Sequence, residues 1–345
     1  MSAPLQTARE LPVDFFPTAR LHLDPLGVPV VEGERAAGIL AGTPDAVAGR
    51  GLTLVIRDPV YISHYFHFLE IFIGLFAFHQ EYLGQIPAER MIFGAQNWNN
   101  ARQNKVQERL IRAVYGGVDL FGTEPFRYGA PRFQNVLVID RNRAITGINK
   151  FLEPLLPQAR HWTPEFRRRV YAATGAAERV VPSEARQLRC AYLPRRPPRT
   201  LGTLERQRLL GLLRERFDVV TEIDFGSLSW RDQVLQAAQT DILVGVHGNG
   251  LSNLLWLPRH AAVVEIFPPD FHAFDYQVMA ELVGLSYFGI EGKKQGYVYV
   301  EGSREGAAYG EQNQPVEYLP ARALESALET IIGRVRARGV PPRVE

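Results

Sequence analysis

The chain has 345 residues, a formal net charge of +2 and one cysteine. The small net charge gives no overall field that favours nucleic acid, and a lone Cys190 excludes an internal disulfide and a cysteine-cluster metal site. Hydrophobic residues make up 46% and charged residues 22% of the chain, a composition typical of globular proteins, and the length predicts two domains.

The start of the chain and its most apolar stretch are informative about the cellular location of the protein. Residues 1–6 lack the basic start and apolar run of a secretory signal. The apolar stretch 61–78 is interrupted by His64, His67 and Glu70, whereas a membrane-spanning helix needs roughly 20 apolar residues with few charges. We therefore expect a cytoplasmic protein, and peripheral contact with the inner face of the membrane stays open.

The N-terminal part of the chain alternates between predicted strands and helices. Residues 1–50 are rich in Pro, Gly and Ala without a sustained period, which predicts extended or loop structure. Apolar runs and helical periods then predict, in order, strand 52–56, an aromatic helix within 61–78, strand 91–93, helix 103–114 and strand 135–140. This alternation favours a parallel sheet with helices on both faces.

A proline-containing, charged segment follows, and a second alternating region begins after it. The predicted strands there are 189–193, 219–221, 242–246 and 262–267, and the predicted helices are 203–216, 230–239, one from 250, and 320–337. We therefore expect an α/β protein with an N-terminal domain over 1–150, a connection over 151–185 and a C-terminal domain over 186–345. The last helix belongs to the C-terminal domain or packs back on the N-terminal one.

A glycine-rich turn, His247-Gly-Asn-Gly250, follows the third strand of this second region. Gly248 and Gly250 lack Cβ atoms where a ligand oxygen would approach, and Asn249 tolerates a left-handed backbone. The pattern predicts a phosphate site at the start of a helix. The alternative is a tight turn that binds nothing. A third glycine is missing from the pattern, which argues against a dinucleotide fingerprint and an NAD enzyme.

Two polar residues just after the turn are further candidates. Ser252 and Asn253 either cap the following helix or form hydrogen bonds with the ligand.

An arginine-rich run, Leu193-Pro-Arg-Arg-Pro-Pro-Arg199, directly follows the first strand of the same region. Because parallel strands end at one edge of the sheet, Arg195, Arg196 and Arg199 are expected near the His247 turn. Guanidinium groups stay charged and bind phosphate oxygens in pairs, which suits a diphosphate. The alternative is a solvated surface loop.

The aromatic helix carries His64, His67 and Glu70 at intervals of three, so they share one helical face. This face predicts acid/base chemistry, with His67 or Glu70 taking a proton from a hydroxyl. A core helix with internally paired polar groups fits the spacing equally well. A metal site would need further ligands. We expect no metal and no other cofactor, because the chain contains no Asp-x-Asp pair.

Several of these segments together resemble glycosyltransferase family 61. The run 241–258, followed by 263–268, resembles the family's signature, and 228–234 and 276–287 extend the similarity. The run 65–70 is similar to an aromatic-His-acid helix of the family's N-terminal domain. The similarity is strong over residues 188–290, weaker over 60–145 and absent from the first fifty.

The resemblance implies a GT-B arrangement of two facing Rossmann-like domains, with an interdomain cleft and sugar transfer that inverts the anomeric centre without a metal. The turn over 247–250 and Arg195 or Arg196 would hold the diphosphate of a nucleotide sugar. Glu265 would face the nucleoside, or else be a buried strand-end carboxylate. Two departures stand out: Asn249 replaces the usual alanine, and Leu201-Gly202 replace the usual Asn-Glu.

The expected function is therefore transfer of a sugar from a nucleotide sugar, UDP-linked, to a hydroxyl of a glycan or lipid-linked glycan. Glu70 or His67 would be the base. The alternative is a catalytically inactive protein of the same fold that binds nucleotide sugars or glycans. The sugar, the acceptor and the oligomeric state stay open.

Overall fold

The computed structural model divides into two compact units, Met1–Val170 and Tyr171–Glu345. It describes residues 13–23, 29–34, 51–57, 64–84, 86–93, 106–121, 132–140, 156–180, 187–269, 271, 273–291, 299–300, 315–316, 318–319 and 321–338. The division falls inside one helix, α4 (Leu156–Thr174). Within the described residues, no helix combines the length and apolarity needed to cross a bilayer.

Unit 1 contains a six-stranded sheet with the order β2-β1-β6-β3-β4-β5. Its elements are β1 (Val13–Leu23), β2 (Pro29–Glu32), β3 (Leu52–Arg57), α1 (Tyr65–Leu83), β4 (Ala88–Phe93), α3 (Val106–Tyr115), β5 (Asp119–Phe121) and β6 (Arg132–Asp140). Strands β6, β3, β4 and β5 are parallel, as the alternation predicts, whereas β1 runs antiparallel to both of its neighbours.

Within residues 1–50, where extended or loop structure was expected, the described residues include the two strands β1 and β2. Alternation is clear over residues 19–22, where Ala19 and Leu21 are buried. Pro17 interrupts the pattern, because proline has no N–H to donate to a neighbouring strand. It is tolerated because β2 pairs only with Arg20–Leu23, so the first half of β1 has β6 as its described partner.

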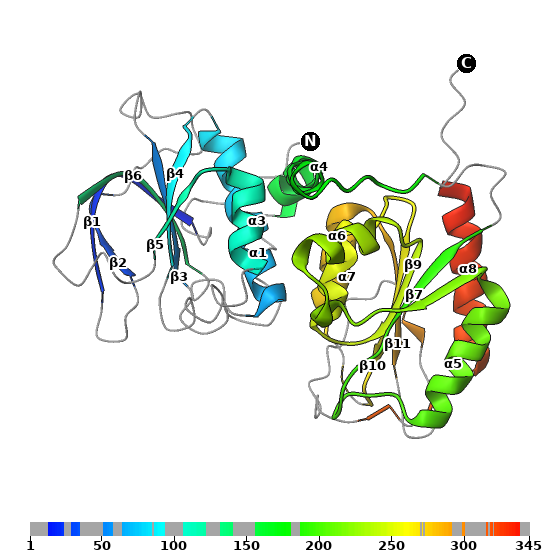
Figure 1. The fold of residues 1–345 in the computed structure, drawn as a ribbon. Coiled ribbons are helices and arrows are strands. Elements are labelled where there is room, and N and C mark those ends of the chain that lie inside the picture. Colours follow the sequence, from blue (N-terminus) through cyan, green and yellow to red (C-terminus); the bar gives the residue numbers. More distant parts are fainter. Residues whose placement is uncertain are drawn as a thin grey trace, which may run out of the picture. The chain divides into compact units, whose positions relative to one another are not determined.

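The described helices α1 and α3 of unit 1 lie on one face of its sheet (Figure 1), whereas helices on both faces were expected. The chain steps from β3 to β4 to β5 in one direction, and right-handed crossovers then place α1 and α3 on the same side. A separate cluster that includes Phe16, Val55 and Val138 consists of strand residues alone. Helix α1 is apolar on nearly all sides and buried accordingly.

Unit 2 contains a second six-stranded sheet, with the order β12-β11-β10-β9-β7-β8. Its strands are β7 (Arg189–Leu193), β8 (Val219–Glu222), β9 (Ile242–Val246), β10 (Ala262–Phe267), β11 (Ser286–Glu291) and β12 (Tyr299–Val300). Its helices are α5 (Thr203–Arg216), η6 (Phe225–Ser227), α6 (Trp230–Ala238), η7 (Asn249–Trp256), α7 (Asp275–Val283) and α8 (Ala321–Arg338). All adjacent strands are parallel except β11 and β12.

Both faces of the unit 2 sheet are covered. Helices α5 and α8 lie on one face, and α6 and α7 lie on the other (Figure 1). The strands β7, β9 and β10 and helix α5 agree with the predicted ranges. The sequence patterns did not predict α7, β11 and β12, and the helix expected from residue 250 is the 3-10 helix η7 rather than an α-helix.

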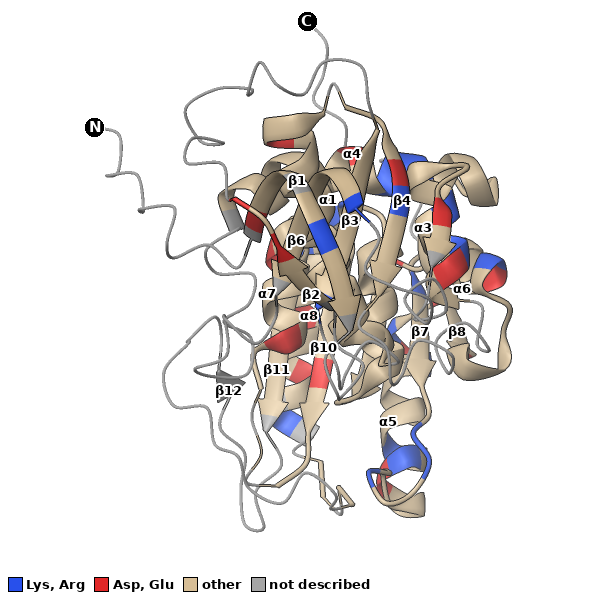
Figure 2. Cartoon of the chain, turned by 90° about the vertical axis from the view of Figure 1, so that its left-hand side faces the viewer, with Lys and Arg blue, Asp and Glu red and all other residues tan. Residues whose placement is uncertain are grey.

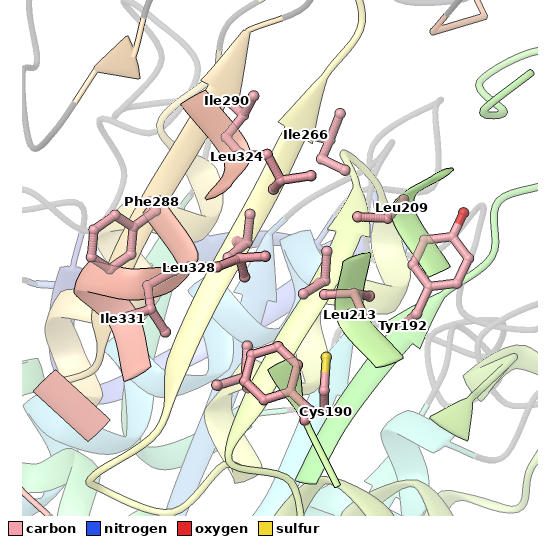
Figure 3. Packing of buried hydrophobic residues seen from close by; sticks show 14 of the residues in the cluster. Cys190, Tyr192, Leu209, Leu213, Ile266, Phe288, Ile290, Leu324, Leu328 and Ile331 are labelled. Carbon is pink, nitrogen blue, oxygen red and sulfur yellow. The ribbon is translucent and has the colours of Figure 1, made fainter. Parts of the chain in front are cut away.

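The main core of unit 2 joins α5 and α8 to the sheet (Figure 3). Leu209 and Leu213 of α5 pack against Tyr192 of β7 in one cluster with Leu328 and Ile331 of α8. Helix α8 therefore packs on the sheet of its own unit. Cys190 lies in this core, where burial raises the pKa of its thiol.

Charged residues are unevenly distributed over the elements of the two units. The strands of both sheets are mostly uncharged, whereas α3 and α5 carry residues of both signs (Figure 2).

In each unit the strand order changes direction beside one strand. In unit 2 the chain passes from β7 to β8 on one side and then crosses back to β9 on the other side of β7. In unit 1 it leaves β3 toward β4 and returns after β5 to β6 on the other side. Ligands of open α/β sheets bind at such points, beyond the carboxyl ends of the diverging strands. The two points direct attention to the loop after β7, the turn after β9 and the start of α1.

The packing of the core predicts that two leucines of α5 contribute unequally to the free energy of unfolding. Replacing the fully buried Leu213 by Ala should lower the free energy of unfolding by about 2–5 kcal/mol, because it leaves a cavity. Leu204, which is 59% exposed on the same helix, is the matched control, and its replacement by Ala should cost less than about 0.5 kcal/mol. Urea unfolding of both variants tests this, and equal losses would contradict the packing described above.

Candidate functional site

The loop after β7 and the turn after β9 meet at the direction change of unit 2. A methyl group added to Gly248 would lie 2.2 Å from Nη1 and 2.3 Å from Cζ of Arg195. The guanidinium of Arg195 therefore packs directly on the backbone of the glycine. Arg195 forms no hydrogen bond or ion pair with any residue that the structure describes. A cationic group thus lies against the glycine turn at the edge of the sheet.

This contact gives a different reason for a glycine at position 248 from the one expected from the sequence. The sequence interpretation kept Gly248 and Gly250 free of Cβ atoms for a ligand, but the space at Gly248 is filled by Arg195. Gly248 also has φ +157° and ψ 172°, a backbone region that is nearly confined to glycine. At Gly250 an added methyl group would make an ordinary contact, 3.5 Å from Cδ1 of Leu193. Gly248 is therefore the constrained position of the turn.

The three arginines of the run take different directions. Burial, followed by the charge of Arg195, lowers the pKa of Arg199. Arg196 instead places Nη2 3.0 Å from Oδ2 of Asp224, and its side chain is 88% exposed. The structure thus gathers Arg195 and Arg199 near the turn, and it pairs Arg196 with a carboxylate.

The first residues of η7 close the turn on itself. Oγ of Ser252 donates to Oδ1 of Asn249 at 3.3 Å, and Nδ2 of Asn253 donates to the Gly250 carbonyl at 3.2 Å. Ser252 also forms a hydrogen bond with Tyr276. Both side chains therefore form hydrogen bonds with residues of the turn, and neither forms an N-cap hydrogen bond for η7.

Beneath the turn, Glu265 of β10 is fully buried. Its Oε1 lies 2.5 Å from Nδ1 of His247, and the hydroxyl of Tyr287 donates to Oε2. Both carboxylate oxygens are thus engaged by protein groups. This geometry favours the buried strand-end carboxylate over the nucleoside contact that the family resemblance implies.

The imidazole of His247 is enclosed by three aromatic rings. Its centroid lies 5.9 Å from that of Phe267, 4.8 Å from that of Phe271 and 5.4 Å from that of Tyr276. Burial is the largest cause that raises the pKa of Tyr276, so its hydroxyl stays protonated. His247 keeps 7% of its surface exposed. The imidazole ring is therefore held in one orientation, and only a small part of the residue is exposed to solvent.

The start of α1 brings together the polar residues predicted in unit 1. Nδ1 of His67 lies 3.2 Å from Oε2 of Glu70, and the rings of His64 and His67 are 4.8 Å apart. These contacts agree with the shared helical face that the spacing predicts. The side chain of Glu70 is 5% exposed and that of His67 is 18% exposed. Of the pair, the imidazole is the group that is better placed to meet a solute.

Sequence reasoning missed some members of the unit 2 site. Tyr276 and Tyr287 lie in a segment noted for family resemblance, but their roles depend on contacts across the sheet. Asp224, the partner of Arg196, lies in a loop after β8 without a sequence signal. Among the described residues, no group of three or more His, Cys, Asp or Glu side chains is arranged to hold a metal ion.

Comparison with known proteins places these sites in a family. The profile of the Glycosyltransferase 61 family matches residues 65–264, which include both the start of α1 and the glycine turn. The chain belongs to this glycosyltransferase family. It is also similar to the EGF domain-specific O-linked N-acetylglucosamine transferase of Drosophila melanogaster, with 32% identity over 126 residues. That match covers 36% of this chain and 24% of the fly protein.

The turn geometry predicts different tolerances for its two glycines. Gly248→Ala should lower the free energy of unfolding by about 1–3 kcal/mol, because alanine is strained in this backbone region. Gly250→Ala is the control, and it should cost less than half as much. Chemical unfolding of both variants measures the difference. Equal tolerance at the two positions would contradict the strained geometry of Gly248.

Proposed function

We propose that the protein is an inverting glycosyltransferase that moves a sugar from a UDP-linked donor to a hydroxyl of a glycan or lipid-linked glycan. Membership of glycosyltransferase family 61 supports the reaction class. The observation that carries the donor site is the guanidinium of Arg195, which lies on Gly248 without an anionic partner among the described residues.

The charges around the turn favour a diphosphate as the bound group. Arg195 and Arg199 lie close enough for the charge of one to lower the pKa of the other. Two like charges in a partly buried place repel each other, and an anion bound between them would remove this repulsion. Guanidinium groups bind phosphate oxygens in pairs, so the arginines can supply the positive charge that a metal supplies in other enzymes. We propose that no metal is required.

Arg196 can bind the diphosphate only if its ion pair with Asp224 is broken. Its guanidinium is paired with Asp224, so it would have to leave this carboxylate before it could bind a phosphate. We therefore assign the main contact with the diphosphate to Arg195.

The start of α1 supplies the base in this proposal. His67 takes the proton of the acceptor hydroxyl, and Glu70, bonded to Nδ1 of the same ring, stabilises the imidazolium that forms. The hydroxyl oxygen attacks C1 of the sugar, the bond between C1 and the diphosphate breaks, and the nucleoside diphosphate leaves with its electron pair. Glu70 itself is the alternative base. A GT-B arrangement, with donor and acceptor meeting between the units, is part of the proposal.

A nucleotide screen tests the proposal as a whole. UDP and UDP-sugars should raise the melting temperature of the protein, and slow hydrolysis of the cognate UDP-sugar should release UDP. Release of UDP would distinguish an enzyme from a binding protein of the same fold. Absence of a thermal shift with every nucleotide diphosphate in the screen would overturn the donor site.

Arg195 should contribute more to turnover than Arg196. Arg195→Ala should lower kcat by about 10²- to 10³-fold, because it removes a charge that stabilises the departing diphosphate. Arg196→Ala is the matched control in the same loop and should change kcat only a few-fold. Steady-state kinetics of both variants decide this. A larger loss at Arg196 would move the diphosphate contact to that residue.

Glu70 should affect chemistry without affecting nucleotide binding. Glu70→Gln should lower kcat by about 10²- to 10⁴-fold, since the base loses its ionised partner or is itself removed. The dissociation constant for UDP should stay unchanged. Glu81→Gln is the control on the same helix, because Glu81 accepts a hydrogen bond from Trp162 at 2.7 Å and is exposed. Weaker UDP binding with normal turnover in Glu70→Gln would refute the proposed role.

A further inference from the structure

Glu265 lies between two glycines of the neighbouring strands. In the register of the sheet it lies between Gly245 of β9 and Gly289 of β11. Paired residues of neighbouring strands point to the same face, so neither neighbour places a side chain beside the carboxylate. The residues on either side of it, Val264 and Ile266, belong to the core on the opposite face. The sheet is therefore built to accept a polar side chain at position 265.

Tyr287 reaches this carboxylate across Gly289. A methyl group added at Gly289 would lie 3.7 Å from the Tyr287 hydroxyl, so the tyrosine ring extends over the glycine. Burial, and then the charge of Glu265, raise the pKa of Tyr287, which keeps its hydroxyl protonated. The hydroxyl thus donates to Oε2 and leaves Oε1 for His247.

The contact with Glu265 determines which nitrogen of His247 faces the ligand. A hydrogen lies on Nδ1, between the ring and Oε1 of Glu265. Nε2 forms no hydrogen bond with a residue that the structure describes, and the three surrounding rings prevent the imidazole from turning. A second hydrogen on Nε2 would make the ring a cation, whose charge the buried carboxylate balances.

A second acid–histidine pair in the same unit has a different environment. Asp241 lies at the start of β9, at the opposite end of the strand from His247, and its Oδ1 is 2.8 Å from Nε2 of His260. It also accepts from the backbone N–H of Arg189 at 2.8 Å and lies 3.5 Å from Nε of Arg179. Asp241 thus ties the strand ends together and has an arginine as a counter-charge. In contrast, Glu265 contacts His247 and Tyr287 and no arginine or lysine among the described residues.

We propose that Glu265 is a positioning residue that holds His247 with its Nε2–H directed at an oxygen of the donor's diphosphate. Tyr287 holds Glu265 in turn. This inference rests on the proposed function, since it assigns a partner to the nucleoside diphosphate already placed at the turn. His247 then donates a hydrogen bond to the phosphate beside Arg195, and no proton is transferred in this contact.

The test compares UDP with uridine, which lacks the phosphates. His247→Gln and Glu265→Gln should each weaken UDP binding on the order of 10-fold, because the first removes the imidazole donor to a charged phosphate oxygen and the second removes the carboxylate that orients this donor. Uridine binding should change little in both variants. Tyr287→Phe should weaken UDP binding less, since it leaves the His247 contact intact. Isothermal titration measures UDP, and ligand-observed NMR measures uridine.

The second pair supplies the matched controls. Asp241→Asn and His260→Gln should lower thermal stability and leave the ratio of UDP to uridine affinity at its wild-type value. If Glu265→Gln does not fold, Tyr287→Phe decides by the same ratio. A double variant, His247→Gln with Glu265→Gln, should bind UDP about as well as His247→Gln alone, because the carboxylate acts through the imidazole.

The outcomes separate the inference from the proposed function. UDP binding to the wild type with an unchanged affinity ratio in the variants overturns the role of Glu265 and leaves the donor site standing. Equal losses of UDP and uridine also overturn it, since they indicate a general structural effect. Failure of the wild type to bind UDP or other nucleoside diphosphates overturns the proposed function and the inference with it.

Discussion

The packing of the Arg195 guanidinium on Gly248 is the interaction on which the candidate donor site depends. It requires β7 and β9 to be neighbours, because the loop of one must reach the turn of the other. It also requires a residue without a side chain at position 248. The strand order 2-1-3-4-5 within unit 2 meets the first condition, and it places the contact where doubly wound sheets bind their ligands. Fold and charge therefore identify the same place.

Two buried carboxylates show how unit 2 treats charge at the two ends of its sheet. Asp241 is fully buried and is stabilised by a backbone N–H, a histidine and an arginine. Glu265 is equally buried, with a histidine and a tyrosine as its contacts. A buried carboxylate costs much free energy unless it is paired. The sparser pairing lies at the ligand end of the sheet, where an additional function can justify this cost.

Much of the fold was predictable because its elements carry local signals. The buried strands β9 and β10 are almost continuous apolar runs. Helix α5 begins after Gly202 and ends before the apolar residue Phe217. Pro17 interrupts the apolar pattern of β1, so this strand was not predicted, and the sequence around η7 did not distinguish a 3-10 helix from an α-helix. The divergence of Arg195 and Arg196 has no local signal, because the two residues are identical and their contacts come from distant parts of the chain. The contacts of Glu265 depend on strand register across 18 to 22 residues.

The glycines of unit 2 then acquire a common explanation. A glycine-rich turn suggests that a ligand approaches the backbone, yet the nearest atoms at Gly245, Gly248 and Gly289 belong to protein side chains. These are Leu193, Arg195 and Phe267, at 3.0, 2.2 and 3.0 Å from an added methyl group. Glycine at these positions lets side chains lie close to the sheet edge. In the proposed donor site, a ligand would therefore meet guanidinium and imidazole groups that are held in place by packing before it binds, and preorganised charge of this kind stabilises a departing diphosphate.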